Sequence, residues 1–184
     1  MNMVWVLVAI VAMLLLAVIA IYNRLVGLRQ QVRQGTADID AQLRQRHDLV
    51  PNLVETVKGY AGHEQATLDA VIRARNAAAT GTPDPDGERQ LGAALGNLIA
   101  LGEAYPDLKA SANFQSLQDE LADVEDKLAA ARRALNAAAA RYNGARESFP
   151  AVLFADALGF APADFHRLDE SEQGRVDQVP RVGF

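Results

Sequence analysis

The chain has 184 residues, half of them apolar and 22 % charged, which is enough for one ordinary domain and one additional element. It contains no cysteine, which excludes a disulfide framework, thiolate metal ligands and lipid attachment through cysteine. The formal net charge is −5, and no basic stripe interleaved with aromatic residues is present, so we expect no nucleic-acid partner.

An uncharged apolar run occupies the N-terminus. Residues 3–22, MVWVLVAIVAMLLLAVIAIY, would span roughly the 30 Å of a bilayer core at about 1.5 Å per helical residue. A cleaved signal peptide is the alternative, but no Lys or Arg precedes Arg24 and the run is longer than a typical signal. Trp5 and Tyr22 lie near the two ends, where interfacial aromatic residues belong. Residues 1–23 are therefore predicted to be a transmembrane anchor with the lipid bilayer as its partner.

The charges that flank this run predict its orientation. Arg24, Arg29 and Arg33 follow the run, and no basic residue precedes it. Because positively charged flanks stay on the cytoplasmic side, we expect a single-pass protein with residues 24–184 in the cytoplasm and the N-terminus outside.

A long helix is predicted to continue directly from the membrane span. Residues of one stripe recur at steps of three and four: Leu25, Leu28, Val32, Thr36, Ile39, Leu43, Arg46, Val50, Leu53, Val57, Tyr60, Glu64, Leu68 and Val71. Pro51 removes the hydrogen bond to the His47 carbonyl and costs about 3 kcal/mol against alanine. Because the stripe stays in register, we expect a kink in one helix, with a true break as the alternative. Asp48 and Asn52 are expected to bond the freed backbone groups.

Two charged residues, Arg46 and Glu64, occupy stripe positions where leucine would be expected. One interpretation places them at the edges of the stripe with their charged ends in water. The other is a buried polar layer in which each charge is paired, which would fix the helix register or form a partner surface.

Proline, glycine and acidic residues in the segment 77–88, AAATGTPDPDGE, predict a break between helices. A helix is expected to restart near Pro85, with Asp84 or Asp86 as its N-cap. Its apolar positions are Leu91, Leu95, Leu98 and Gly102. Gly92 and Gly96 form a GxxxG pattern, which we interpret as close backbone packing in a soluble helix.

The most regular pattern in the chain follows Tyr105 and Pro106, which end the previous helix. Alternating steps of three and four indicate coiled-coil-like packing of a second long helix, with Ser111 or Asn113 as N-cap. Its stripe positions are Phe114, Leu117, Leu121, Val124, Leu128, Ala131, Leu135, Ala138, Tyr142 and Ala145.

A shorter helix is predicted after Pro150, with Ser148 as its cap and Gly159 as its stop. Its apolar positions are Val152, Leu153 and Leu158. Phe160 and Phe165 are expected to dock on the bundle, and residues 169–184 to be mobile. The predicted fold is all-α: a transmembrane helix that continues into an elongated antiparallel bundle of about four helices, over residues 24–168.

The histidines do not form a recognisable reaction site. His63 and Glu64 begin like the zinc motif HExxH, but Thr67 stands where the second histidine is required. His47 has Pro51 one turn later, and His166 lies in the irregular tail. The chain has no GxSxG, Walker-type or GxGxxG motif. We therefore expect no catalytic residue, no metal and no cofactor.

Four sequence blocks resemble the LemA family of bacterial membrane proteins: residues 22–32, 38–64, 104–111 and 141–160. The resemblance covers residues 22–184, although DKLAAARRALNAAAARYN is richer in alanine than the family pattern and Gly183 replaces a commoner aspartate. It implies an inner-membrane protein with one N-terminal span, a short external N-terminus, a cytoplasmic antiparallel bundle and no established enzymatic activity. The following residues transfer only as motif members: Arg46, His47, Asp48, Pro51, Asn52, Tyr60, His63 and Glu64.

The functional hypothesis is a non-enzymatic, membrane-anchored scaffold or adaptor that associates with itself, through its long heptad surfaces, or with other membrane proteins. Family members are often encoded near a membrane metalloprotease or TPM-domain proteins, so a regulatory partner of such a protease or of an envelope-stress system is the alternative. A hydrolase that uses His63 and Glu64 is a weaker alternative.

Overall fold

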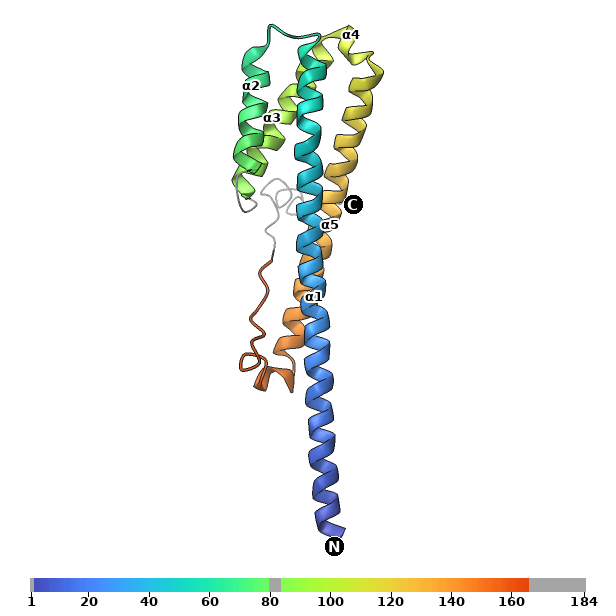
Figure 1. Ribbon diagram of the computed structural model, residues 1–184, viewed down its shortest axis with the longest axis vertical. Helices are drawn as coiled ribbons and strands as arrows, with labels where there is room; N and C mark the ends of the chain where they lie inside the picture. Colours follow the sequence, from blue (N-terminus) through green and yellow to red (C-terminus); the bar gives the residue numbers. More distant parts are fainter. Residues whose placement is uncertain (1, 80–83, 166–184) are drawn as a thin grey trace, which may run out of the picture. The chain divides into compact units, whose positions relative to one another are not determined.

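The structure is a computed structural model that describes residues 2–79 and 84–165. Within these residues the fold is all-α, as predicted, and no strand is present (Figure 1). The elements in chain order are α1 (Asn2–Lys58), α2 (Gln65–Ala79), α3 (Pro85–Ala104), α4 (Pro106–Lys109), α5 (Ala112–Glu147) and the 3₁₀ helix η1 (Ala151–Leu153). The tail 169–184, predicted to be mobile, lies outside the described residues.

The N-terminal apolar run forms the first part of α1. All side chains from Met3 to Ala20 are exposed to the surroundings. By length and composition, α1 is the one helix of the described part that is able to cross a membrane. The helix runs on past Tyr22 without interruption, as predicted from the absence of turn residues there.

The chain divides into two compact units. We call residues Met1–Gly35 with Arg132–Phe184 the anchor unit, and residues Thr36–Ala131 the helical unit. Both α1 and α5 contribute residues to each unit, and each unit has its own apolar core.

The core of the helical unit is built from the predicted stripes of α1, α3 and α5. Val50, Leu53 and Val57 of α1 are buried with Val71 of α2, and Leu98 of α3 is fully buried. The α5 stripe from Phe114 to Val124 closes the same core. The steps of three and four therefore identified the buried faces of α3 and α5 correctly, and that of α1 except at Thr36, which is exposed.

The first long helix is shorter than predicted. It ends at Lys58, and a turn over residues 59–64 separates it from α2. Gly59 and Gly62 lie in this turn, where their low helix propensity favours a break. The Glu64 carbonyl accepts from the backbone N–H groups of Thr67 and Leu68, which starts α2. The predicted stripe positions Tyr60 and Glu64 are wrong, because both are exposed loop residues.

The ends of α3 follow their sequence signals. The Asp84 side chain accepts from the backbone N–H groups of Asp86 and Gly87, and Pro85 is the first helical residue. The helix ends at Ala104, before Tyr105 and Pro106. The predicted apolar positions are all buried: Leu91, Leu95, Leu98 and Gly102.

The interpretation of the GxxxG pattern in α3 is wrong. Gly92 and Gly96 are exposed, and a Cβ atom built on either would meet nothing within 4 Å. Close packing occurs instead at Gly102, where a Cβ atom would lie 2.3 Å from Cζ of Phe114. Only a residue without a side chain allows this phenyl ring to approach α3 so closely.

The start of α5 agrees with the predicted position, since Ser111 directly precedes the helix. The side chain of the other candidate, Asn113, donates to Oγ1 of Thr56 in α1 at 3.0 Å. The stripe of α5 is buried, except that Ala131 and Ala145 are half-buried. In the anchor unit, Leu135 packs against Gly35.

The segment after α5 is not the predicted helix. Only Ala151–Leu153 is helical, as a 3₁₀ turn, and the predicted core residues Val152, Leu153 and Leu158 are exposed. Gly159 has φ of 76°, in the left-handed region, and redirects the chain as a stop residue should. Ser148 does not cap a helix, since its hydroxyl donates to the Gly144 carbonyl.

Phe160 fills the core of the anchor unit, together with Leu25, Tyr142, Ala151 and Ala155. Its ring lies edge-on to Tyr22, with centroids 5.4 Å apart, and under the guanidinium of Arg29. The predicted docking of Phe160 is thus confirmed. That of Phe165 is wrong, because this side chain is exposed.

Candidate functional site

Arg46 is the centre of a polar cluster inside the helical unit. Its side chain is only 4 % exposed, and Glu88, from the first turn of α3, is 6 % exposed. They are the two buried charged residues of the described chain. Burial of a charge is unfavourable unless it is paired and hydrogen-bonded, so the partners of Arg46 decide what the cluster does.

The guanidinium of Arg46 reaches two other helices. Nη2 donates to the Glu88 carboxylate and, at 3.1 Å, to the Glu88 backbone carbonyl in α3. Nη1 donates to Oε1 of Glu125 in α5 at 2.8 Å. The other Glu88 carboxylate oxygen lies 2.8 Å from Nε2 of His47. One arginine thereby connects α1, α3 and α5.

A fourth helix joins the cluster through the backbone of His47. Nε of Arg75, in α2, donates to the His47 carbonyl at 2.9 Å. This is the carbonyl whose ordinary helical partner, the N–H of residue 51, is missing because that residue is proline. Arg75 therefore satisfies the acceptor that Pro51 leaves free, and α1 continues as a helix through the proline.

The electrostatics of the cluster keep Arg46 charged. Burial lowers the pKa of the guanidinium, but the hydrogen bonds and charges of Glu125 and Glu88 outweigh it, and the pKa is raised above its ordinary value. The stability that a raised pKa provides is fully present at any pH below the pKa of the group in the unfolded chain. It is lost only when the pH rises through the pKa of the group in the folded protein. The pairing therefore persists throughout the neutral range.

The hydrogen bonds of the cluster fix the positions of the helices relative to one another. Each oxygen of the Glu88 carboxylate accepts a hydrogen bond, one from Arg46 and the other from His47. One oxygen of the Glu125 carboxylate accepts a hydrogen bond from Arg46. In residues 2–79 and 84–165, no group of His, Asp and Glu side chains is placed to hold a metal ion. Each charged group of the cluster is therefore paired, although Nε of Arg46 is buried without a hydrogen-bond partner among the described residues. The pairing favours one arrangement of the four helices over alternatives.

The remaining motif residues do not join this cluster. Asp48, Asn52, Tyr60, His63 and Glu64 are exposed. Of the two interpretations offered for Arg46 and Glu64, the buried polar layer holds for Arg46. Glu64 has its charged end in water as the other interpretation expects, but it lies in the loop after α1 and not at the edge of a helical stripe. Asp48 and Asn52 were expected to bond the backbone freed by Pro51, but that expectation is wrong because Arg75 occupies the freed carbonyl.

Sequence reasoning missed Glu88, Glu125 and Arg75, although one signal was present. The α3 stripe at Leu91 and Leu95 extends backwards by three residues to Glu88, an acidic residue on a buried face. A buried positive charge on one stripe and a negative charge on another predict an ion pair. Arg75 lies four residues after Val71 and three before Ala78, so the same extension of the stripe would have reached it. Glu125 lies beside the stripe of α5, so periodicity could not have revealed it.

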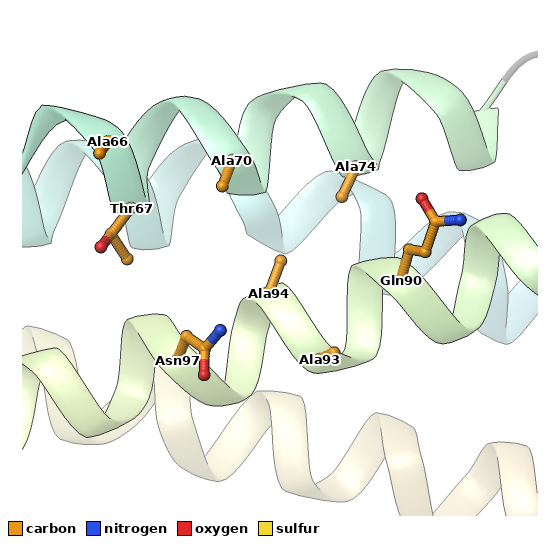
Figure 2. A pocket seen from close by; sticks show the side chains of 8 residues that line it. All are labelled: Ala66, Thr67, Ala70, Ala74, Gln90, Ala93, Ala94 and Asn97. Atoms are coloured by element: carbon orange, nitrogen blue, oxygen red, sulfur yellow. The ribbon is translucent and has the colours of Figure 1, made fainter.

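A shallow groove of about 470 Å³ lies between α2 and α3 of the helical unit. Figure 2 shows small side chains from the two helices facing one another across it, among them Ala70 of α2 and Ala94 of α3. The complete lining is Ala66, Thr67, Ala70, Ala74, Gln90, Ala93, Ala94 and Asn97. None of these residues is titratable, so the lining provides shape and amide or hydroxyl groups without an acid or base.

The chain is similar to several known proteins. It is 25 % identical over 173 residues to magnetosome protein MamQ of Magnetospirillum gryphiswaldense, which covers 78 % of this chain and 64 % of that protein. It is 24 % identical over 173 residues to magnetosome protein MamQ 1 of Paramagnetospirillum magneticum, with the same coverage. The chain therefore spans just under two thirds of the length of these relatives.

A further relative is protein LemA of Metamycoplasma hominis, which is 24 % identical over 159 residues and covers 84 % of this chain and 73 % of that protein. The model of the LemA family matches residues 35–184. This range begins inside the resemblance expected from residue 22 onwards, and it contains every residue of the Arg46 cluster. Because the family model matches well over half of its length, the chain belongs to the LemA family.

Proposed function

We propose that the protein is a non-enzymatic scaffold or adaptor anchored in the cell membrane through the first part of α1. The observation that supports this most directly is that one uninterrupted helix, α1, contains both the apolar run and Arg46. Because α1 continues from the apolar run to Arg46 without a break, no linker segment separates the two along the chain. We also propose that this surface is cytoplasmic, following the arginines after the span.

The charge of the helical unit indicates the kind of partner. Residues 36–131 contain sixteen acidic and eight basic residues. Exposed acids follow one another along α5, at Asp119, Glu120, Asp123 and Asp126. Such a surface favours partners with a basic face and opposes close approach of a second identical surface.

The heptad positions that the sequence analysis proposed for self-association are buried by packing within the same chain. Phe114, Leu121 and Val124 are buried in the core of the helical unit. A complex would therefore use residues outside the heptad stripe, such as the acidic face of α5 or the α2–α3 groove. Small side chains in a groove permit the close approach of an incoming helix.

Photo-crosslinking in membranes tests this proposal. A benzophenone amino acid at Ala122, an exposed residue of α5, should give a discrete crosslinked product in cells that express the full chain. Replacement of Asp119, Glu120 and Asp126 by their amides should reduce that product, because the basic partner loses its attraction. Ser116→Ala, on the same helix and also exposed, is the neutral control.

The identity of the crosslinked product separates the functional alternatives. A homodimer would support self-association, and another membrane protein would support an adaptor. Capture of a membrane metalloprotease would favour the regulatory alternative, which deletion would then test through altered processing of the protease's substrates. A strict monomer that yields no product from Ala122 or from the groove position Ala93 would contradict the proposal.

A further inference from the structure

The loop after α5, residues 148–159, exposes apolar side chains. Phe149 is 80 % exposed and Leu153 is 71 % exposed, and Val152 and Leu158 are exposed as well. Four large apolar residues in twelve positions are unusual for a loop in water. The loop is nevertheless attached to the rest of the anchor unit, because Ala151 and Ala155 are buried in its core.

The helix register places this loop at the end of the membrane span. In the anchor unit, Leu135 lies against Gly35 and Nη2 of Arg141 lies 3.4 Å from Oε1 of Gln31, so α5 runs antiparallel to α1. At the same rise per residue in both helices, the end of α5 at Glu147 is level with about Arg24. The chain beyond Glu147 is then level with Tyr22 and the last turns of the apolar run.

Direct contacts agree with this register. Phe160, which follows the loop, packs against Tyr22, the aromatic residue at the end of the apolar run. The Arg146 guanidinium pairs with Asp156 inside the loop and donates through Nε to the Phe160 carbonyl at 2.7 Å. These contacts hold both ends of the loop beside the point where α1 would leave the bilayer.

The charge of the anchor unit fits a lipid surface. Residues 24–35 and 132–165 contain seven arginines and three acidic residues, whereas the helical unit is strongly acidic. Arg24, Arg33, Arg133 and Arg141 are exposed. Arginines near a span attract anionic headgroups, and aromatic and aliphatic side chains enter the interface beside them.

We propose that residues 148–159 form a second membrane contact, in which Phe149, Val152 and Leu153 insert into the interface of the bilayer that α1 crosses. The occupant of this apolar surface is therefore lipid, with anionic headgroups bound by the neighbouring arginines. This inference rests on the membrane anchor of the proposed function but not on the scaffold role. Its consequence is that the C-terminal end of α5 is fixed at the bilayer as well as α1.

Depth-dependent fluorescence quenching tests the contact in the full chain. Because the chain has no cysteine, Leu153→Cys and Phe149→Cys each give one labelling site for an environment-sensitive dye. The variants are reconstituted in vesicles of phosphatidylcholine and phosphatidylglycerol that contain lipids with a nitroxide near the headgroup, for the loop positions, or midway along the acyl chain, for the position inside the span. Leu14→Cys, within the apolar run, reports the anchor, and Ala122→Cys, exposed on α5 of the helical unit, reports background.

We expect nitroxide lipids to quench the dye at Leu153 and at Phe149, and to leave the dye at Ala122 at background. Removal of phosphatidylglycerol should weaken quenching at the two loop positions. Quenching at Leu14 without quenching at either loop position would overturn the inference and leave the anchor intact. A loop dye that instead transfers energy to a second labelled copy would overturn it in favour of a protein contact. Loss of quenching at Leu14 would refute the anchor itself, and with it both proposals.

Discussion

Glu88 of α3 accepts hydrogen bonds from two consecutive residues of α1: Arg46 through its guanidinium and His47 through Nε2. Consecutive residues of a helix project about 100° apart, so a single carboxylate can meet both only at one rotation of α1 about its axis. Glu125 holds the same guanidinium from α5. The network thereby fixes rotation and register, which an interface of interchangeable leucines and valines would specify less strictly.

Breaking the Arg46–Glu88 pair should be costly, while removing both charges should not. Glu88→Leu leaves the Arg46 charge buried without its main partner, so we expect a loss of about 3–5 kcal/mol in the free energy of unfolding. Arg46→Met should cost a similar amount for the converse reason. The double variant should recover most of the loss, because replacement of a buried ion pair by apolar side chains is often neutral. Urea unfolding in mild detergent, followed by helical circular dichroism, measures all three.

Glu125 provides the matched control for that experiment. Its side chain is 45 % exposed, so its carboxylate keeps much of its hydration when it pairs with Arg46. Glu125→Gln should therefore cost on the order of 1 kcal/mol or less. If Glu88→Leu proved no more harmful than Glu125→Gln, burial would not govern the cluster.

Pro51 and Arg75 should be energetically coupled. Pro51 is exposed, so Pro51→Ala creates no cavity and restores the missing N–H for the His47 carbonyl. We expect Pro51→Ala to stabilise the protein by roughly 1–3 kcal/mol, since alanine is favoured in a helix interior but proline restricts the unfolded chain. Arg75→Met should destabilise the natural sequence by about 1–2 kcal/mol by leaving that carbonyl without a donor.

The coupling appears when the two changes are combined. In the Pro51→Ala background the His47 carbonyl has a helical partner, so Arg75→Met should cost clearly less than it does alone. A double-mutant cycle from four unfolding curves gives this difference. Purely additive effects would show that the Arg75 contact is incidental to the proline.

The positions of the helices were predictable from sequence because burial imposes a period on them. Leu91, Leu95 and Leu98 mark the buried face of α3, and Asp84 marks its start, each through a local rule. The break at residues 59–64 was missed because Tyr60 and Glu64 kept the period by coincidence. Gly59 and Gly62 were the better signal, since two glycines within four residues weaken a helix more than a continued pattern supports it.

The polar cluster was only partly predictable. Arg46 could be identified as a charge on a buried stripe, but its partners depend on which helices lie next to α1. Glu125 reaches the cluster from a position outside the apolar stripe of α5, so tertiary packing alone brings it there. Arg75 continues the stripe of α2 beyond Val71, but its contact with the His47 carbonyl depends on how α2 packs against α1. The prediction of a helix after Pro150 was wrong for a related reason, because burial there does not follow side-chain size. The buried residues, Ala151 and Ala155, are small, and the large apolar residues are exposed.

Gly102 and Gly96 should respond oppositely to alanine. At Gly96 a Cβ atom meets nothing within 4 Å, so Gly96→Ala should stabilise α3 by up to about 1 kcal/mol through helix propensity. At Gly102 a Cβ atom would lie 2.3 Å from the buried ring of Phe114, so the ring or α3 must move. Overpacking of this kind costs about 1–3 kcal/mol, which exceeds the propensity gain through most of that range. The midpoints of urea unfolding should therefore shift in opposite directions, and equal shifts would contradict the close contact.

Asn143 should control the order of the segment that follows Phe160. Its side chain donates to the Ala163 carbonyl at 2.8 Å and accepts from the Ala163 N–H at 2.9 Å, which pins this segment to α5. Asn143→Ala removes both bonds, each worth about 0.5–1.5 kcal/mol, so the Ala163 amide should exchange with solvent roughly five- to a hundred-fold faster. The Phe160 amide, which donates to the Ala155 carbonyl at 3.0 Å, should keep its protection because Phe160 remains in the core. Hydrogen exchange of the detergent-solubilised chain measures both amides at once, with Asn97→Ala on the exposed face of α3 as the control. Equal acceleration at both amides would mean that the whole loop is released, and that the Asn143 bonds hold more than the segment they contact.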